Sequence, residues 1–221
     1  MKYVYEFIGT FFLVATVGMV VIQPGAAAVG FAPIAIGTVL AVMIFAGGHV
    51  SGGHYNPAVS LAVFLRGDKR EFTITHMLIY WVVQLAAGFV AALLALYLKG
   101  ALSAANGEAV AVPVVNVGSV LIPALIAEFL GTFALTYTVL NVATAKATSG
   151  NSFYGWAIGM AVLASAYAFG GISGGAFNPA VALGITQMGV TGWMNIWVYW
   201  VAQLLAAVVA AYTFKAAHPG E

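Results

Sequence analysis

Cysteine is absent from the sequence, and only 6% of the residues are charged. The absence of cysteine excludes disulfides, thiolate metal sites and cysteine nucleophiles. A soluble protein needs about a quarter of its surface residues charged, and seven basic and six acidic residues are too few to cover 22.8 kDa. The net charge of +1 leaves no basic stripe to neutralise phosphates. These shortages exclude a soluble domain and a nucleic-acid-binding protein.

Hydrophobic residues take the place of the missing charges. They make up 63% of the chain, and the mean hydropathy is +1.03. A membrane-spanning helix needs about 20 mostly apolar residues, and six stretches have this character: 4–22, 30–48, 76–98, 118–141, 153–170 and 192–214. Turn residues separate several of them, namely Gln23-Pro24-Gly25, Arg66-Gly67-Asp68, Ala105-Asn106-Gly107 and Thr148-Ser149-Gly150-Asn151. We therefore predict an all-α membrane protein with six transmembrane helices.

The basic residues predict the orientation of these helices. Six spans place both termini on one side, and loops on the cytoplasmic side carry an excess of Lys and Arg. If the termini are cytoplasmic, the outer side holds only Lys99, and the inner side holds Lys2, Arg66, Lys69, Arg70, Lys146 and Lys215. The distribution predicts cytoplasmic N- and C-termini.

The two halves of the chain repeat each other. The segment EFIGTF at 6–11 returns as EFLGTF at 128–133, and VSGGHYNPAV at 50–59 returns as ISGGAFNPAV at 172–181. YWVVQL at 80–85 returns as YWVAQL at 199–204. Each unit holds three spans, so the second copy enters from the opposite face, as in an inverted repeat. We expect one transmembrane domain over residues 1–221, with repeat 1 at about 1–100 and repeat 2 at about 117–217.

Two apolar segments are too short to span the membrane: Asn56 to Leu65 and Asn178 to Met188. At 1.5 Å per residue each makes about 15 Å of helix, half of the ~30 Å hydrocarbon core. Both start with Asn, a strong N-cap, and then Pro, which suits the first helical position. Inversion brings one such half-helix in from each face. The pattern predicts two re-entrant half-helices that meet at the midplane, around a pore or a substrate site.

With these motifs the sequence resembles the aquaporin (major intrinsic protein) family over nearly its whole length. The resemblance rests on six spans, a Glu at the start of each half, Tyr199-Trp200 in the last helix and two Asn-Pro-Ala boxes, which are Asn56, Pro57, Ala58 and Asn178, Pro179, Ala180. It implies a passive channel for water and other small uncharged solutes, with no catalytic residues, metal or other cofactor. Its partners would be lipid, the permeating solutes and three further copies in a homotetramer.

The resemblance also implies roles for the polar residues inside the spans. Asn56 and Asn178 would direct side-chain N–H donors into the lumen, with their carbonyls held by local backbone. There they would orient water and exclude ions and protons together with the half-helix dipoles. Glu6 and Glu128 are either structural acceptors for the re-entrant loops or proton and ion relays, and the repeat favours acceptors. His49 and His54 would support the first loop.

Counting from the boxes places the family's outer constriction at Ile36, Ala166, Gly175 and Val181. Most members carry Arg at the position of Val181, and strict water channels tend to carry His at that of Ala166. The constriction is therefore expected to be wider and less polar, as in some plant vacuolar members with Val that pass urea, ammonia or hydrogen peroxide. Two other positions resemble water-type members instead. Glycerol facilitators carry Asp at the position of Ala182, and Tyr199-Trp200 is similar to the aromatic pair of the water-type members.

Two alternative functions stay open at this point. One is a facilitator mainly for glycerol, urea or ammonia. The other is a secondary transporter, which also uses inverted repeats and broken helices, with Glu6 or Glu128 as coupling carboxylate. An enzyme is not expected, because the sequence holds no paired carboxylates, metal cluster or nucleophile–base set. The short terminal segments resemble prokaryotic members and predict the plasma (inner) membrane.

Overall fold

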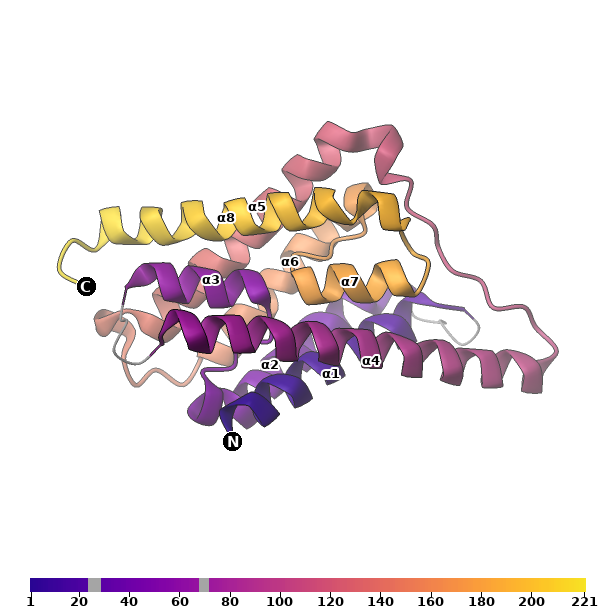
Figure 1. The fold of residues 1–221 in the computed structure, drawn as a ribbon, viewed down its shortest axis with the longest axis horizontal. Coiled ribbons are helices and arrows are strands. Elements are labelled where there is room, and N and C mark those ends of the chain that lie inside the picture. Colours follow the sequence, from indigo (N-terminus) through magenta and orange to yellow (C-terminus); the bar gives the residue numbers. More distant parts are fainter. Residues whose placement is uncertain (24–28, 68–71) are drawn as a thin grey trace.

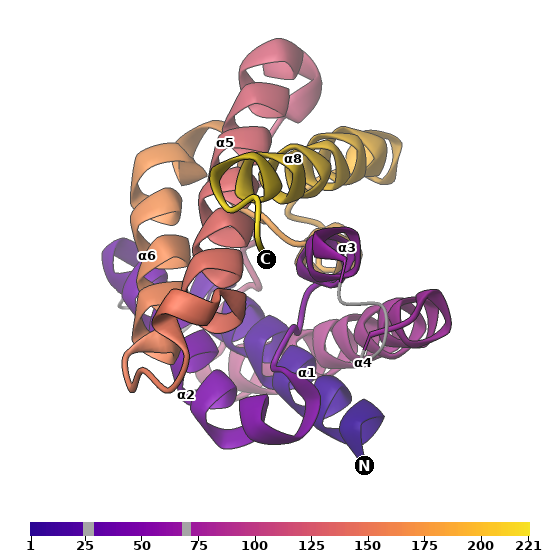
Figure 2. The ribbon, with the colours of Figure 1, turned by 90° about the vertical axis from the view of Figure 1, so that its left-hand side faces the viewer.

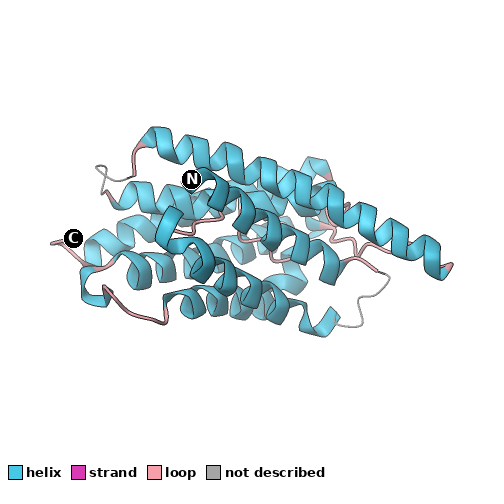
Figure 3. Cartoon of the chain, turned by 90° about the horizontal axis from the view of Figure 1, so that it is seen from below, coloured by secondary structure: helices cyan, strands magenta, loops and turns pink. Residues whose placement is uncertain are grey.

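The computed structural model describes residues 1–23, 29–67 and 72–221, and their regular structure is helical (Figure 3). Six helical segments in this part of the chain are long and apolar enough to cross a membrane. Their main helices are α1 (Lys2–Val21), α2 (Ala32–Ser51), α4 (Ile74–Asn106), α5 (Leu121–Val139), α6 (Tyr154–Ser173) and α8 (Ile196–Ala217). The prediction of an all-α membrane protein with six spans is confirmed.

The helix ends differ from the predicted spans most clearly in α4. This helix has 33 residues, or about 50 Å, against the 23 expected from 76–98. Thr73 caps its start, and the helix continues to Asn106 because the first residue with left-handed backbone is Gly107, at φ +66°. The predicted turns at 23–25 and 66–68 fall partly outside the described residues, and so do Lys69 and Arg70.

Two short helices lie end to end in the middle of the molecule (Figure 1). They are α3 (Pro57–Arg66) and α7 (Pro179–Gln187), and each has Pro in its first turn. Figure 2 looks along the bundle and shows α3 between α4 and α8. Because α3 and α7 begin near each other and run in opposite directions, neither crosses the bundle alone.

Small residues allow the helices to approach closely. A Cβ added to Gly88 on α4 would lie 2.7 Å from the carbonyl oxygen of Ala180 on α7. A Cβ on Gly37 of α2 would lie 2.6 Å from the carbonyl oxygen of Gly159 on α6. Such contacts are typical of membrane helices, whose packing rests on close backbone approach. The first contact holds α4 against the half-helix α7, and the second holds α2 against α6.

Both chain termini lie at the same end of the bundle, the left-hand end in Figure 1. This end is called the inner side below, and the opposite end the outer side. The chain runs from inner to outer side in α1, α4 and α6, and back in α2, α5 and α8.

Candidate pore

Three cavities follow one another through the bundle. The central lumen has a cavity volume of about 60 Å³, the outer cavity about 470 Å³ and the inner cavity about 630 Å³. The lumen shares Val21, Ile36, Gly174 and Gly175 with the outer cavity, and Ile158 with the inner cavity. The shared wall residues make the three spaces neighbours, in the order outer cavity, lumen and inner cavity.

Asn56 and Asn178 line the lumen at the point where the two half-helices begin. The side-chain oxygen of Asn56 accepts a hydrogen bond from the backbone N–H of Ala58 at 2.8 Å. The oxygen of Asn178 accepts one from the N–H of Ala180 at 2.9 Å. Each Asn therefore caps its own half-helix, as its position before Pro predicts.

The amide nitrogens of the same two residues reach across to the opposite loop. Nδ2 of Asn56 donates to the carbonyl of Phe177 at 3.0 Å, and Nδ2 of Asn178 donates to that of Tyr55 at 2.8 Å. A side-chain amide has two N–H groups, so this bond uses one of them and the other remains for a permeating molecule. That each Asn offers a hydrogen bond to a permeating molecule stays a prediction, and the structure adds that one of its two N–H groups joins the two loops.

The helix N-termini add an electrostatic contribution at this depth. The aligned peptide dipoles of a helix place about half a positive charge at its N-terminus. Two such ends face the lumen beside Asn56 and Asn178. The arrangement disfavours a cation at the centre of the lumen and leaves a neutral molecule unaffected.

Glu6 of α1 is fully buried and holds the first re-entrant loop by its carboxylate. Oε1 accepts from the Ser51 hydroxyl at 2.7 Å and the His54 N–H at 2.9 Å, and Oε2 accepts from the Tyr55 N–H at 2.7 Å and Gln84 Nε2 at 2.9 Å. Four donors at these distances suit an ionised carboxylate, which only accepts hydrogen bonds.

Glu128 of α5 repeats this arrangement in the second half. It is also fully buried, and its carboxylate accepts from the Ser173 hydroxyl at 2.6 Å, the N–H groups of Ala176 and Phe177 at 2.9 and 2.8 Å, and Gln203 Nε2 at 2.8 Å. Both carboxylates thus lie behind the loops, and neither is among the residues that line the lumen.

Sequence reasoning did not single out the partners of these carboxylates. Ser51, Ser173, Gln84 and Gln203 supply the side-chain donors, and the Tyr80 hydroxyl donates to the Ser51 carbonyl at 2.7 Å. The sequence did contain a signal for these partners, because all of them belong to the segments that are repeated in the two halves. Their polar groups at matching positions of both halves are what a symmetric support for two loops requires.

Tyr55 and Phe177, which precede the two Asn residues, have unusual backbone conformations. Their φ angles are +47° and +48°, a left-handed conformation that costs side-chain-bearing residues energy. Each ring packs directly on a glycine, Tyr55 on Gly9 and Phe177 on Gly131, where an added Cβ would overlap the ring. The motif Glu-x-x-Gly therefore serves both loops, since Glu binds their N–H groups and Gly leaves room for the ring.

The two histidines have different surroundings. His54 is buried, lines the lumen, and its Nδ1 lies 3.1 Å from the Ser60 hydroxyl in the first turn of α3. His49 is exposed in the last turn of α2, contacts the Tyr5 ring and lines the inner cavity. Support of the first loop by either histidine stays a prediction, and the position of His49 is at the inner mouth.

Two of the four predicted constriction residues lie where the lumen meets the outer cavity, and the other two lie on either side of this boundary. Ile36 and Gly175 line both spaces, Val181 lines the lumen and Ala166 lines the outer cavity. On α6 the lumen wall is formed by Val162 and Ile158 instead. Ala166 thus belongs to the outer approach, and none of the described residues that line this boundary carries a charged side chain.

The lumen wall is otherwise apolar. Among its lining residues, the polar side chains are those of Asn56, Asn178 and His54, and the others are aliphatic residues and glycines. In the described part of the chain no group of three or more His, Asp or Glu side chains is placed to hold a metal ion.

Six spans around two opposed half-helices, with a cavity through their meeting point, define an integral membrane protein with a pore. The family model "Major intrinsic protein" matches residues 1–214. The chain belongs to the major intrinsic protein family.

Individual relatives agree with this assignment. The chain is 35% identical to "Aquaporin TIP1-1" of Arabidopsis thaliana over 178 residues, which are 80% of this chain and 66% of that protein. It is also 35% identical to "Aquaporin-8" of Rattus norvegicus over 175 residues, 79% of this chain and 65% of that protein. The chain therefore spans slightly less than two thirds of the length of these two relatives.

A solved structure shares the fold. The aquaglyceroporin from Plasmodium falciparum superposes with a TM-score of 0.78, and the match covers 99% of this chain and 96% of that one. At 23% sequence identity this likeness concerns the fold alone.

Proposed function

We propose that the protein is a passive channel for water and other small uncharged solutes, with no enzymatic activity. The observation that carries this proposal is the lumen cavity lined by both Asn56 and Asn178 and joined to a cavity on each side. Donors at the centre offer hydrogen bonds to a neutral molecule, while the half-helix dipoles oppose cations and protons. The aquaporin names of the relatives support the same function.

The solute range rests on the boundary between the lumen and the outer cavity. Ile36, Ala166, Gly175 and Val181 offer no charge and no side-chain donor there. Without a fixed donor to select water, and with Gly175 contributing no side chain, this wall suits urea or ammonia as well as water. The aquaporin names of the relatives do not favour the alternative of a facilitator mainly for glycerol, urea or ammonia.

The transporter alternative receives less support from the carboxylates. A coupling carboxylate has to exchange protons or ions with the permeation path. Glu6 and Glu128 are fully buried behind the loops, and each accepts four hydrogen bonds that hold a loop in place. We assign both as structural acceptors that keep the Asn-Pro-Ala boxes at the centre.

We further propose that the inner side is cytoplasmic and that the protein acts as a homotetramer. The described basic residues of the inner side are Lys2, Arg66, Lys146 and Lys215, and exposed aliphatic side chains on several spans offer surfaces for lipid or further copies. The relatives named above come from a plant and a rat. Their sources argue against the prokaryotic inner membrane expected from the short terminal segments.

Stopped-flow light scattering on proteoliposomes tests the proposed function. Gradients of sucrose, glycerol, urea and an ammonium salt give the permeability for water and each solute separately. The matched variants are Val181→Trp, which fills the lumen, and Val201→Trp, which places the same side chain on an exposed face of α8. We expect linear flux in the wild type and in Val201→Trp, and loss of flux in Val181→Trp. Saturation, or accumulation driven by a proton or sodium gradient, would contradict the channel.

A further inference from the structure

Four buried polar atoms on the long helices have no hydrogen-bond partner among the described residues. They are the hydroxyl oxygens Oγ1 of Thr10 and Thr132 and the amide oxygens Oε1 of Gln84 and Gln203. All four side chains are fully buried. A buried polar group without a hydrogen bond costs free energy, and in folded proteins such groups are bonded to protein or to ordered water. The four atoms therefore point to a bound molecule.

The internal repeat relates these atoms as two pairs. Thr10 and Thr132 are each the fifth residue of the repeated segments at 6–11 and 128–133. Gln84 and Gln203 are each the fifth residue of the repeated segments at 80–85 and 199–204. The same two residue types thus lack a partner at the same positions of both halves. This recurrence indicates a feature of the fold, because the placement of one stray side chain would not be repeated.

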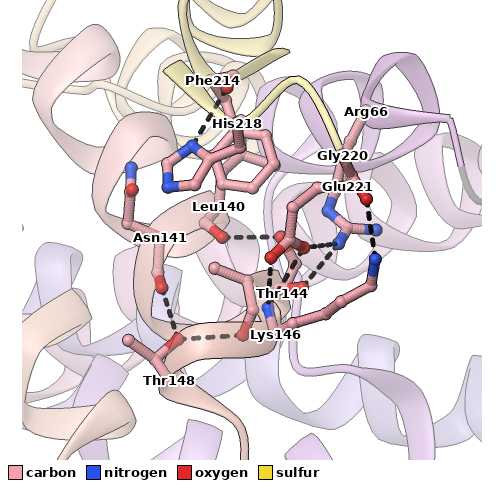
Figure 4. Close-up of polar contacts among 11 residues, drawn as sticks. Arg66, Leu140, Asn141, Thr144, Lys146, Thr148, Phe214, His218, Gly220 and Glu221 are labelled. Atoms are coloured by element: carbon pink, nitrogen blue, oxygen red, sulfur yellow. Dashed lines mark hydrogen bonds and ion pairs between the residues drawn. The ribbon is translucent and has the colours of Figure 1, made fainter.

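An unpartnered nitrogen at the inner side has a different setting. Nε of Arg66 also lacks a partner among the described residues, but Nη2 of the same guanidinium donates to the Glu221 carboxylate at 2.9 Å and to the Thr144 carbonyl at 2.6 Å (Figure 4). The residue 122 positions after Arg66 is Met188, which has no such nitrogen. Arg66 is therefore not part of the repeated arrangement.

The threonine and the glutamine of each pair lie beside the same carboxylate. Gln84 Nε2 donates to Glu6 Oε2 at 2.9 Å, and Thr10 follows Glu6 by one turn on the same face of α1. The second half has the same order on α5 and α8, with Glu128, Thr132 and Gln203. Each pair thus joins two helices at the level of a loop-supporting carboxylate.

The carboxylate fixes the orientation of the glutamine amide. An ionised carboxylate only accepts hydrogen bonds, so the NH₂ group of Gln84 has to face Glu6 and its oxygen has to face away. The same Nε2 also donates to the Ser60 hydroxyl at 3.1 Å, which uses its second hydrogen. Oε1 is therefore an acceptor that needs a donor from elsewhere, and a rotated amide cannot supply one.

The threonine hydroxyls are free to supply a hydrogen bond outside their own helix. Other buried threonines, Thr136 and Thr186, donate to the carbonyl four residues earlier in the same helix, at 2.7 Å in both cases. Thr10 and Thr132 make no such bond within the described chain. Each half therefore holds one available donor and one available acceptor beside the same carboxylate.

We propose that each half of the protein binds one water molecule between these two side chains, at positions named here the repeat water sites. One site is formed by Thr10 and Gln84, the other by Thr132 and Gln203. The water accepts a hydrogen bond from the threonine hydroxyl and donates one to the amide oxygen, so both groups are satisfied. None of the four residues lines the lumen. The bound water is therefore distinct from permeating water and completes the hydrogen bonding behind each re-entrant loop.

A crystal structure of the full chain, at a resolution that shows ordered water, tests the proposal directly. We expect one water within hydrogen-bond distance of Thr10 Oγ1 and Gln84 Oε1, and a second one at the other site. Thr10→Val removes the hydroxyl and keeps the shape of the side chain, so this variant should lose the first water and retain the second. Thr10→Ser keeps the hydroxyl and should retain both, and it carries the test if Thr10→Val does not fold.

Thermal unfolding in detergent gives a second readout. Thr10→Val leaves the buried Gln84 oxygen without its bridge, so we expect the midpoint to fall by about 2–4 °C or more. Thr132→Val should behave alike. The matched control is Thr136→Val, because this buried hydroxyl donates only to carbonyls of its own helix. Its midpoint should stay within about 1 °C of the wild type, since such a bond adds little to helix stability.

Two structural results would overturn the proposal. One is a wild-type structure that shows ordered water elsewhere in the protein and none at either site. The other is a direct hydrogen bond between the Thr10 hydroxyl and Gln84 Oε1. Equal shifts of the midpoint in Thr10→Val and Thr136→Val would also contradict it. Neither readout measures flux, so a wild type without water permeability would contradict the proposed function and leave the repeat water sites unaffected.

Discussion

Asn56 and Asn178 are each hydrogen-bonded to the loop that carries the other, at 3.0 Å to the Phe177 carbonyl and at 2.8 Å to the Tyr55 carbonyl. Each residue thereby performs two tasks, since its oxygen caps a half-helix and its nitrogen joins the two halves of the chain. The depth at which the two half-helices meet is consequently set by a reciprocal pair of contacts.

The first prediction follows from this pair. Asn56→Ala removes an N-cap and a buried cross-loop hydrogen bond, each worth about 1 kcal/mol. We expect a loss of about 2 kcal/mol in the free energy of unfolding, measured by thermal unfolding in detergent. Asn106→Ala, at the exposed C-terminal residue of α4, serves as control and should cost less. Additive effects of Asn56→Ala and Asn178→Ala would show that the two contacts are independent, contrary to expectation.

The second prediction concerns Val181. Val181→Arg places a guanidinium with five donors at the boundary between the lumen and the outer cavity. We expect permeation of glycerol, urea and ammonia to fall by a larger factor than that of water, because the wall becomes narrower and offers water fixed partners. Val181→Met lengthens the side chain without adding charge or donors. It therefore separates the effect of a narrower wall from the effect of fixed hydrogen-bond donors. Equal losses for water and the larger solutes would mean that residue 181 does not line the selective constriction.

The third prediction concerns the buried carboxylates. Glu128→Gln replaces one acceptor oxygen by an NH₂ group, which faces donors already in place. Loss of two hydrogen bonds to a charged group should cost about 3 kcal/mol or more in stability, seen as a lower midpoint of thermal unfolding. Flux per folded channel should stay passive and independent of pH, and Glu6→Gln should behave alike. If the wild type instead showed gradient-driven transport and a Gln variant lost it, the replaced residue would be a coupling carboxylate.

The fourth prediction concerns the glycines beneath the two rings. Gly131→Ala inserts a methyl group into the Phe177 ring, and such overpacking costs about 1–3 kcal/mol. A smaller side chain at position 177 makes room for the methyl group. The double variant Gly131→Ala, Phe177→Leu should therefore recover part of the thermal stability that Gly131→Ala loses. Gly170→Ala is the control, because no neighbouring heavy atom lies within 4 Å of its added Cβ. If Phe177→Leu restored nothing, the contact between ring and glycine would not be the cause.

The fifth prediction uses the absence of cysteine. Mercurials find no thiol in this chain, so water flux in the wild type should persist in mercuric chloride. Val162→Cys introduces a thiol into the lumen wall, and mercury should then block flux in a manner that a thiol reductant reverses. Val209→Cys on an exposed part of α8 should remain insensitive. Block of the wild type would indicate an unforeseen site of attack.

Much of the architecture could be predicted because its signals are local. A run of about 20 apolar residues is enough to indicate a span, and Asn followed by Pro is enough to indicate where α3 and α7 begin. The repeated segments also contained the residues that later proved to surround Glu6 and Glu128. The predicted span 76–98 is shorter than α4, because polar residues after position 98 end the apolar run but do not end the helix.

The spans, the two half-helices and the residues at their tips could be predicted from the sequence, since each depends on neighbours within a turn or two. Long-range contacts could not: Asn56 binds the carbonyl of Phe177, 121 positions away, and Arg66 binds Glu221, 155 positions away. The tertiary structure also placed His49 at the inner mouth and Ala166 in the outer approach. The physical reason is that such contacts depend on how inverted halves pack, through close approaches such as Gly37 on Gly159, and no local pattern encodes that geometry.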